Sequence, residues 1–385
     1  MSRDSNVVPK ADSPRLSFDL ATQADDYQLR QLLRNIRMEG IISVSFRREP
    51  NYFAAHDCEG EFVQVIVARD RQSSQIVGMG SRSLRELYVD GTAQTIGYLS
   101  GLRIHPAHRG GTMLARGYRF LRKLDEDQRA AYYLTTIATE NRPALEALVG
   151  GRGGLPYYER IGQYVTWIVP RKVKWEPPSR QPTARQHQIR PINQADVPEL
   201  LRFIHQCAGA QQFIPRYQES DFCFPARKFP GMNSKDLWGL WVDGVLVGTL
   251  GIWDQREIKQ VVVEKYGWWL QWLRPLYNSW AKVVGRPSFP RPGECLPLVA
   301  TALPLATPDG ATLFGELIDE VANHLPDHAD AMMIGMSEND PLTDTLRRRA
   351  IQNYKTEIYV VAWDAQKLRS RAWNETIPYL ELGTL

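Results

Sequence analysis

The sequence predicts an α/β (α+β) protein of two tandem domains, each a mixed central sheet flanked by helices. The first observation behind this prediction is the pattern of residues 95–124. An extended apolar run is followed by a glycine-containing loop and then by a helical pattern: TIGYLSGLRIHP, AHRGG, TMLARGYRFLRKL. The other is that a strand-then-helix pattern begins again at Ile189, after the basic, proline-containing stretch 171–187. A chain of 385 residues, 43% of them hydrophobic, is long enough for two cores.

The first domain is predicted to span residues 16–170, after a polar, flexible tail at residues 1–15. A strand begins at Leu16, and Thr22 or Asp25 then caps an amphipathic helix. Further elements expected from periodicity are strands at 62–68 and 76–87, a hairpin at Asp90-Gly91, and a strand ending at Ile104.

The stretch 171–187 has the composition of a linker, and residues 188–385 are predicted to form the second domain. IRPINQADVPELLRFI predicts a strand and a capped helix, and Asp243-Gly244 indicates another hairpin. Near the end, AMMIGMSENDPLTDTLRRRAIQNYKTEIYVVAWD predicts strand, loop, helix and strand. The order of elements therefore repeats that of the first domain.

The loop after the first domain's central strand has the composition of an anion site. A strand that ends at a helix N-terminus presents backbone N–H groups to an anion, and Arg109 adds positive charge. Gly110 and Gly111 would let a pyrophosphate approach the backbone closely. The alternative is an ordinary strand-to-helix turn, and this stretch alone does not choose between the two.

A second motif, downstream, favours the anion site. Together with LRIHPAHRGGTML, the phrases EN-x-x-A-x-x-x-L and YYERIGQ resemble the acetyl-CoA-binding core of the GNAT acyltransferase superfamily. The match departs from the family pattern where Thr112 and Leu114 replace an expected glycine and an expected small residue. A glycine-rich segment, LVGGRGGLP, also lengthens the connection before Tyr158.

The resemblance implies an acyl-CoA donor, acetyl-CoA or another, and no metal. It implies that the backbone of three strand residues follows the pantetheine, and that the backbone of the next loop surrounds the pyrophosphate. The strand residues are Leu102, Arg103 and Ile104; the loop residues are Arg109, Gly110, Gly111, Thr112 and Met113. Asn141 is expected to contact the cofactor arm.

Acyl transfer to an amine also needs a proton donor for the leaving thiolate and a base for the amine. The resemblance implies that Tyr158 is the donor, with Tyr157 as the fallback; the alternative is a core tyrosine. Where many relatives carry a glutamate this chain has Ser100, which cannot act as a base alone. The candidates are therefore Glu140, Glu86, or a water relayed through Ser100 or Tyr98.

The second domain lacks the corresponding loop. LVATALPLATPDGATLFGELI has neither an arginine nor an open glycine pair at the turn, and Asp309 would repel a pyrophosphate. We therefore expect this domain to shape the substrate cleft or a dimer surface.

Two further stretches are unusual. Tyr266 to Trp280, YGWWLQWLRPLYNSW, forms one apolar face that Pro275 would kink or end. It could pack on the other domain or a second subunit, hold an acyl chain, or lie on a membrane interface. The final IPYLELGTL is expected to dock as a strand, and the carboxylate of Leu385 could reach the first domain's site.

The predicted function is that of an N-acyltransferase acting on an amine of a small molecule or a protein, in the first domain. A tRNA-dependent aminoacyl transferase of the peptidoglycan type and a non-catalytic acyl-CoA-binding scaffold are the alternatives. A net charge of +4 without a dense basic run gives no indication of nucleic acid. Four scattered cysteines and no predicted membrane span favour a cytoplasmic protein, and a homodimer is open.

Overall fold

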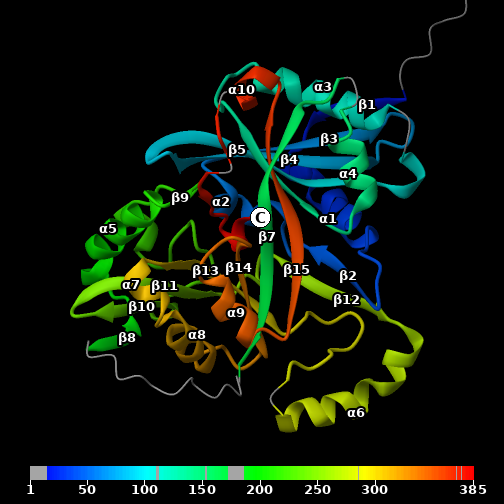
Figure 1. Cartoon of the computed structure of the whole chain (residues 1–385). Helices are drawn as coiled ribbons and strands as arrows, with labels where there is room; N and C mark the ends of the chain where they lie inside the picture. The colour runs from blue at the N-terminus through cyan, green and yellow to red at the C-terminus, as the bar shows by residue number, and fades with distance from the viewer. Residues whose placement is uncertain are drawn as a thin grey trace, which may run out of the picture.

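The computed structural model describes residues 15–109, 112–151, 154–171, 186–284, 286–369, 371–373 and 375–385. All but one residue of the expected tail and most of the expected linker lie outside these ranges. One mixed sheet of twelve strands runs through the molecule, with helices on both faces (Figure 1). The predicted α/β class is therefore confirmed.

The elements of the first half alternate as the periodicity predicts. The strands are β1 (Leu16–Leu20), β2 (Ile42–Arg47), β3 (Phe62–Asp70), β4 (Ile76–Val89), β5 (Thr92–Ile104), β6 (Tyr133–Ala138) and β7 (Tyr157–Pro170). The helices are α1 (Asp26–Asn35), α2 (His56–Glu59), α3 (Met113–Asp125) and α4 (Arg142–Leu148).

The second half repeats the pattern with additions. Its strands are β8 (His187–Pro191), β9 (Gln211–Gln212), β10 (Leu237–Val242), β11 (Val245–Trp253), β12 (Gln260–Tyr266), β13 (Leu298–Ala306), β14 (Ala331–Ser337), β15 (Gln352–Ala362) and β16 (Ile377–Pro378). Its helices are α5 (Val197–Ala208), α6 (Trp268–Val284), α7 (Pro308–Ala311), α8 (Phe314–Asn323), α9 (Thr343–Arg349) and α10 (Ala365–Arg369).

Both predicted hairpins form with the expected turn chemistry. Asp90 and Gly91 have φ of 50° and 72°, and Asp243 and Gly244 have φ of 50° and 81°. Two successive positive φ values give a turn whose twist matches that of the flanking strands, and Asp-Gly tolerates it best. These turns fix the β4–β5 and β10–β11 registers.

The two halves exchange their last strands. The sheet order is β1-β3-β4-β5-β6-β15-β7-β14-β13-β11-β10-β8. β15, from the second half, lies between β6 and β7, and β7, from the first half, lies between β15 and β14. β2 and β12 add a second pairing between the halves. Each half is therefore completed by a strand of the other.

Separate apolar clusters hold the helices on the sheet. α1 packs on one face of β3 and β4 through Leu29, Leu32 and Leu33, and α3 packs on the opposite face through Met113, Tyr118 and Leu121. In the second half, α5 and α8 lie on opposite faces in the same way. The C-terminal segment 377–385 packs over the centre of the sheet, where the chain ends in Figure 1.

Helix α6 departs from what the sequence suggested. It continues through Pro275, so ending the helix there is the wrong alternative. Trp268 and Trp272 are 79% and 83% exposed, so the alternative that they pack against the other domain is also wrong. The helix stands away from the central sheet (Figure 1).

Candidate active site

Two neighbouring parallel strands diverge in the middle of the sheet. β5 and β6 pair only at Gly97 with Tyr133 and at Tyr98 with Leu134. A Cβ at position 97 would lie 2.1 Å from the Tyr133 ring, so only glycine allows this contact. Beyond these pairs the two strands separate, which leaves backbone N–H and C=O groups of both strands available to a ligand.

Side chains tie the strands together where they begin to part. The Tyr98 hydroxyl lies 2.8 Å from Thr136 Oγ1, and Thr135 Oγ1 donates to the Leu99 carbonyl at 2.8 Å. Burial raises the pKa of Tyr98 to about 12. Tyr98 is therefore a protonated, fixed phenol at neutral pH.

The wide end of the opening meets the N-terminus of α3. Thr112 is the N-cap residue, its side chain makes no capping bond within the described residues, and the first turn contains no acidic residue. Arg109 is exposed beside this end, with its Nε 3.4 Å from the Ile104 carbonyl. The helix end is therefore electropositive. Gly110 and Gly111, expected in the same loop, lie outside the described residues.

The other expected donor-binding residues line this opening or lie behind it. Leu102 is partly exposed, and the Arg103 guanidinium folds back on the Leu102 carbonyl at 3.0 Å. Burial lowers the pKa of Arg103. Ile104 and Met113 pack into a small apolar cluster, so only their backbone groups could reach a ligand.

Asn141 and Glu140 lie at the turn between β6 and α4. The Asn141 side chain accepts the Ala144 N–H at 3.3 Å and so caps α4. Glu140 is exposed beside it. Ser100 lies in β5 opposite Ser81 on β4.

Tyr158 lies at the start of β7, among the apolar side chains that α3 and α4 place over β6. Its hydroxyl is 2.6 Å from that of Tyr118, a residue of α3. Burial raises the pKa of Tyr158 well above its usual value and that of Tyr118 to about 12. Both phenols therefore hold their protons at neutral pH. Tyr157, the fallback, is exposed.

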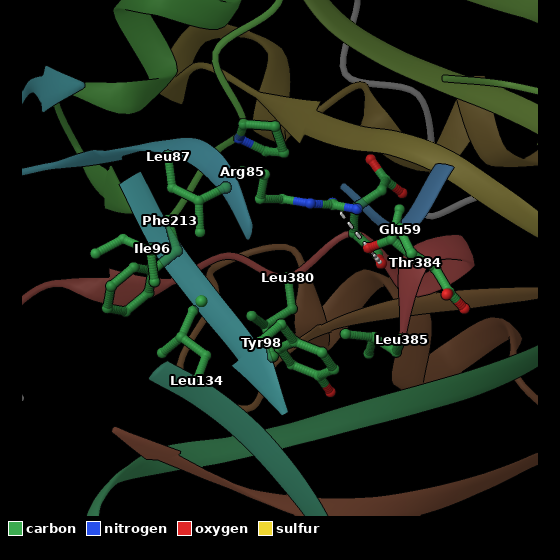
Figure 2. A pocket seen from close by; sticks show the side chains of 13 residues that line it. Glu59, Arg85, Leu87, Ile96, Tyr98, Leu134, Phe213, Leu380, Thr384 and Leu385 are labelled. Carbon is green, nitrogen blue, oxygen red and sulfur yellow. Dashed lines mark hydrogen bonds between the residues drawn. The ribbon is translucent and has the colours of Figure 1, made fainter. Parts of the chain in front are cut away.

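A small cavity lies on the other face of the same strands. Figure 2 shows Tyr98 and Leu134 of the diverging pair opposite Leu380 and Leu385 of the C-terminal segment. Its volume of about 20 Å³ is room for one water molecule. The last residues of the chain therefore lie against the β5–β6 opening.

Glu381 is one of two buried acids that line this cavity. Its Oε2 accepts the Tyr379 hydroxyl at 2.6 Å and the Leu303 N–H at 3.1 Å. Its Oε1 is buried and has no partner among the described residues. Burial raises the pKa of Glu381 to about 7, although the two hydrogen bonds by themselves would lower it. A carboxyl group with this pKa can take up or release a proton at neutral pH.

A second buried acid in the same wall is fully paired. Glu59 forms an ion pair with Arg48 and lies 3.5 Å from Lys259 Nζ. Burial alone would raise the pKa of Glu59, but the two cations outweigh it and the pKa is lowered. Nearby, Arg85 donates to Thr384 Oγ1 at 3.1 Å. Glu59 is thus a fixed anion that anchors the cavity wall.

Sequence reasoning did not select Glu381 or Glu59 as site residues. Glu381 follows the apolar run IPYL, and a lone acid in an apolar segment was the available signal. Glu86, by contrast, faces Arg216 at 3.1 Å on an exposed surface.

Other site classes have little support in the described part of the chain. There, no group of three or more His, Cys, Asp or Glu side chains is arranged to hold a metal ion. No described helix has the length and hydrophobicity to span a membrane.

The opening between β5 and β6, the N-terminus of α3 beside it and the strand order are those of the GNAT fold. Comparison with solved structures gives the same fold. No protein-family model matches the sequence, and no curated protein sequence matches it significantly. Structures do match. Saccharomyces cerevisiae N-myristoyltransferase with bound myristoyl-CoA has a TM-score of 0.57 and 11% identity, over 94% of this chain and 86% of that one.

A second similar structure is the GCN5-related glucosamine N-acetyltransferase region of a fungal multi-domain β-N-acetylglucosaminidase. It has a TM-score of 0.63 and 12% identity, over 92% of this chain and 39% of that one. The resemblance found in the motifs is thereby confirmed for the fold: the chain consists of two GNAT-like halves in tandem.

Proposed function

We propose that this chain is an acyl-CoA-dependent N-acyltransferase that moves an acyl group, acetyl being the first to test, to an amine of a small molecule or a protein. The observation that carries the proposal is the opening between β5 and β6, which leads to the electropositive N-terminus of α3. A thioester arm between the strands and a pyrophosphate at the helix end would use both features. The structures similar to this chain include one with bound myristoyl-CoA, which supports an acyl-CoA donor.

The donor would be held mainly by backbone groups. The N–H and C=O groups of Leu102–Ile104 would pair with the pantetheine amides, and those of Arg109–Met113 would bind the pyrophosphate. Asn141, the N-cap residue of α4 on the other side of the opening, would contact the cofactor arm. The catalytic half is then the first, within the predicted boundaries 16–170.

Tyr158 would be the general acid. In the reaction, the amine nitrogen forms a bond to the thioester carbon, the carbon–sulfur bond breaks, and the thiolate takes a proton. Tyr158 is protonated at neutral pH because of its burial, and the Tyr118 hydroxyl can hand on a replacement proton at 2.6 Å.

Glu381 is the base that we favour for the amine proton. It shares the cavity wall with Gly97 and Tyr98, two or three positions from Ser100, and its pKa of about 7 suits proton uptake at neutral pH. Glu140 is exposed at the turn between β6 and α4 and does not line the cavity, and Ser100 would serve only to position a water. The four cysteines are free thiols, which fits a reducing compartment such as the cytoplasm.

The test is calorimetric titration of acetyl-CoA and longer acyl-CoAs into the full chain. Arg109→Glu should weaken binding by at least about tenfold, because it reverses charge beside the pyrophosphate site. Arg347→Glu is the matched control, since Arg347 is an exposed arginine on α9 in the second half.

Binding without turnover of any tested amine would favour the acyl-CoA-binding scaffold. Absence of binding to every acyl-CoA would overturn the proposal and favour a tRNA-linked donor.

A further inference from the structure

Helix α6 presents an apolar stripe that no described part of the chain covers. Five side chains at helical spacing form it: Trp268, Trp272, Leu276, Trp280 and Val283. All five are among the exposed large apolar residues, and Trp272 and Val283 are 83% and 85% exposed. We call these five residues the Trp stripe. Exposed apolar surface of this extent on one element marks a contact with something else.

The opposite side of α6 is fixed to the protein. Leu270 and Ala281 are its buried residues. Tyr277 stacks on Phe289 with 4.4 Å between ring centroids, and the Asn278 side chain exchanges two hydrogen bonds of 2.9 Å with the Phe289 backbone. The Trp stripe is therefore held outward, and folding back onto the body would break these contacts.

The charged side chains of α6 and of the loop after it are basic, between Glu264 before the helix and Glu294 at the end of the loop. Residues 265–293 contain five basic side chains and no Asp or Glu: Lys265, Arg274, Lys282, Arg286 and Arg291. Lys265 is engaged with Glu39 at 2.9 Å, whereas Lys282 and Arg286 are exposed at the end of the helix. The surface therefore complements an anionic partner.

The apolar surface continues past the start of the helix. Gly267 donates its N–H to the Ile41 carbonyl at 2.8 Å, and the Ile41 side chain is 62% exposed. Ile41 lies at the entry to β2, the strand that pairs with β12. The exposed apolar surface thus includes residues from two segments that are distant in sequence, and these segments are joined by hydrogen bonds.

We propose that α6 docks on the surface of an anionic lipid bilayer, with the Trp stripe in the headgroup region and the basic side chains on lipid phosphates. A single helix with tryptophans and leucine on one face and Lys and Arg beside it has the composition of an interfacial helix. At 17 residues it is about 25 Å long, shorter than the roughly 30 Å that a span requires, so it lies on the bilayer. A second copy of this chain would bring like charge against like charge.

This inference does not depend on the acyltransferase proposal. The test is co-sedimentation of the full chain with vesicles of phosphatidylcholine alone or mixed with phosphatidylglycerol. The wild type should sediment with the mixed vesicles more than with the neutral ones, and salt should reduce the difference. Failure to sediment with either kind of vesicle would overturn the proposal.

Variants separate the apolar and the charged contributions. Trp272→Ser with Leu276→Ser should reduce partitioning by about tenfold or more, because two inserted side chains are lost. Tyr27→Ser with Val245→Ser removes two exposed apolar side chains elsewhere and should change nothing. Lys282→Glu with Arg286→Glu should remove the preference for phosphatidylglycerol, whereas Arg202→Glu with Arg347→Glu should keep it.

The altered side chains are exposed, so thermal unfolding should be unchanged in each variant. Unchanged partitioning of the Trp272/Leu276 variant would overturn the proposal. A second outcome would also overturn it: the wild type is a dimer by sedimentation equilibrium, the variant is a monomer, and neither protein binds vesicles.

Discussion

Glu381 combines burial, two hydrogen bonds to Oε2 and a buried Oε1 that has no partner in the described part of the chain. A structural carboxylate is normally paired with a cation and has a lowered pKa, as Glu59 has. Glu381 has a raised pKa and lies beside the diverging strands, which is the pattern of a working acid or base. Such a group costs stability, and this cost is measurable.

The cost has a predicted pH dependence. Between pH 4.5 and about 7 the unfolded chain has released the Glu381 proton while the folded chain keeps it, so stability falls as pH rises through this window. The full loss, roughly 3 kcal/mol at about 1.4 kcal/mol per pKa unit, is present above pH 7. Glu381→Gln should therefore raise the melting temperature at pH 8 and leave it unchanged below pH 4.5. Equal melting temperatures at every pH would contradict the raised pKa.

The same variant tests the role of Glu381 as a base. Under the proposed function, Glu381→Gln should lower kcat by about 10²- to 10⁴-fold and remove the rise in rate near pH 7. Glu381→Asp should recover part of the rate. A kcat within a factor of two of the wild type for Glu381→Gln would assign the base elsewhere, with Glu140 next to be tested.

Tyr158 gives a separate prediction. Tyr158→Phe should lower kcat by about 10²-fold while acyl-CoA affinity stays the same, because the hydroxyl acts only on the leaving thiolate. Tyr157→Phe is the control, since the neighbouring ring is exposed. An equal loss in both variants would show that the hydroxyl of Tyr158 has no special role.

At the scale of elements, the opening between β5 and β6 depends on how closely the two strands approach at their two paired positions. Gly97 permits that approach, and Tyr98 and Thr135 connect the strands just beyond it. In the second half, β13 and β14 diverge similarly after Ala300 pairs with Met333. There, however, Gly310 packs so tightly that a Cβ would lie 2.2 Å from the Val247 carbonyl oxygen. That turn packs directly on β11.

Gly97→Ala tests the close approach. The added methyl would meet the Tyr133 ring at 2.1 Å, so the strands must shift and stability should fall by about 1–3 kcal/mol. In Gly80→Ala the nearest atom is 3.9 Å away, an ordinary contact, so this variant of neighbouring β4 should be close to neutral. Chemical denaturation measures both, and equal effects would mean that the approach at Gly97 is not tight.

For the whole molecule, the strand exchange makes the two halves one cooperative unit. β15 pairs with β7 over its whole length and with β6 from Thr356 to Val361, and β7 pairs with β14 over seven residues from Tyr164 to Pro170. A first half expressed alone would expose the free edge of β6 and the long strand β7. Unpaired strand edges associate with other chains.

We therefore expect a fragment of residues 1–171 to aggregate when expressed alone. Coexpressed with residues 186–385 it should form a soluble complex, because the exchanged strands then find their partners. Circular dichroism and size-exclusion chromatography would detect this. A monomeric, folded first-half fragment would contradict the interdependence of the halves.

The sequence by itself determined the elements and the fold class. Periodicity located β3, β4 and α3, the Asp-Gly turns set two hairpins, and the LRIHPAHRGG and YYERIGQ motifs indicated the GNAT fold. These signals are local, since they depend on residues close together in the chain and on backbone preferences that tertiary contacts did not override.

Only the tertiary structure decided which strands became neighbours and what surrounded each side chain. The exchange of β7 and β15 joins segments nearly 200 residues apart. The local sequence of each strand is compatible both with this exchange and with pairing inside its own half. The raised pKa of Glu381 and the exposure of Trp272 likewise depend on partners far away in the chain. Burial is a property of the assembled molecule, and for that reason the chemistry of Glu381 and the outward face of α6 could not be predicted from the sequence.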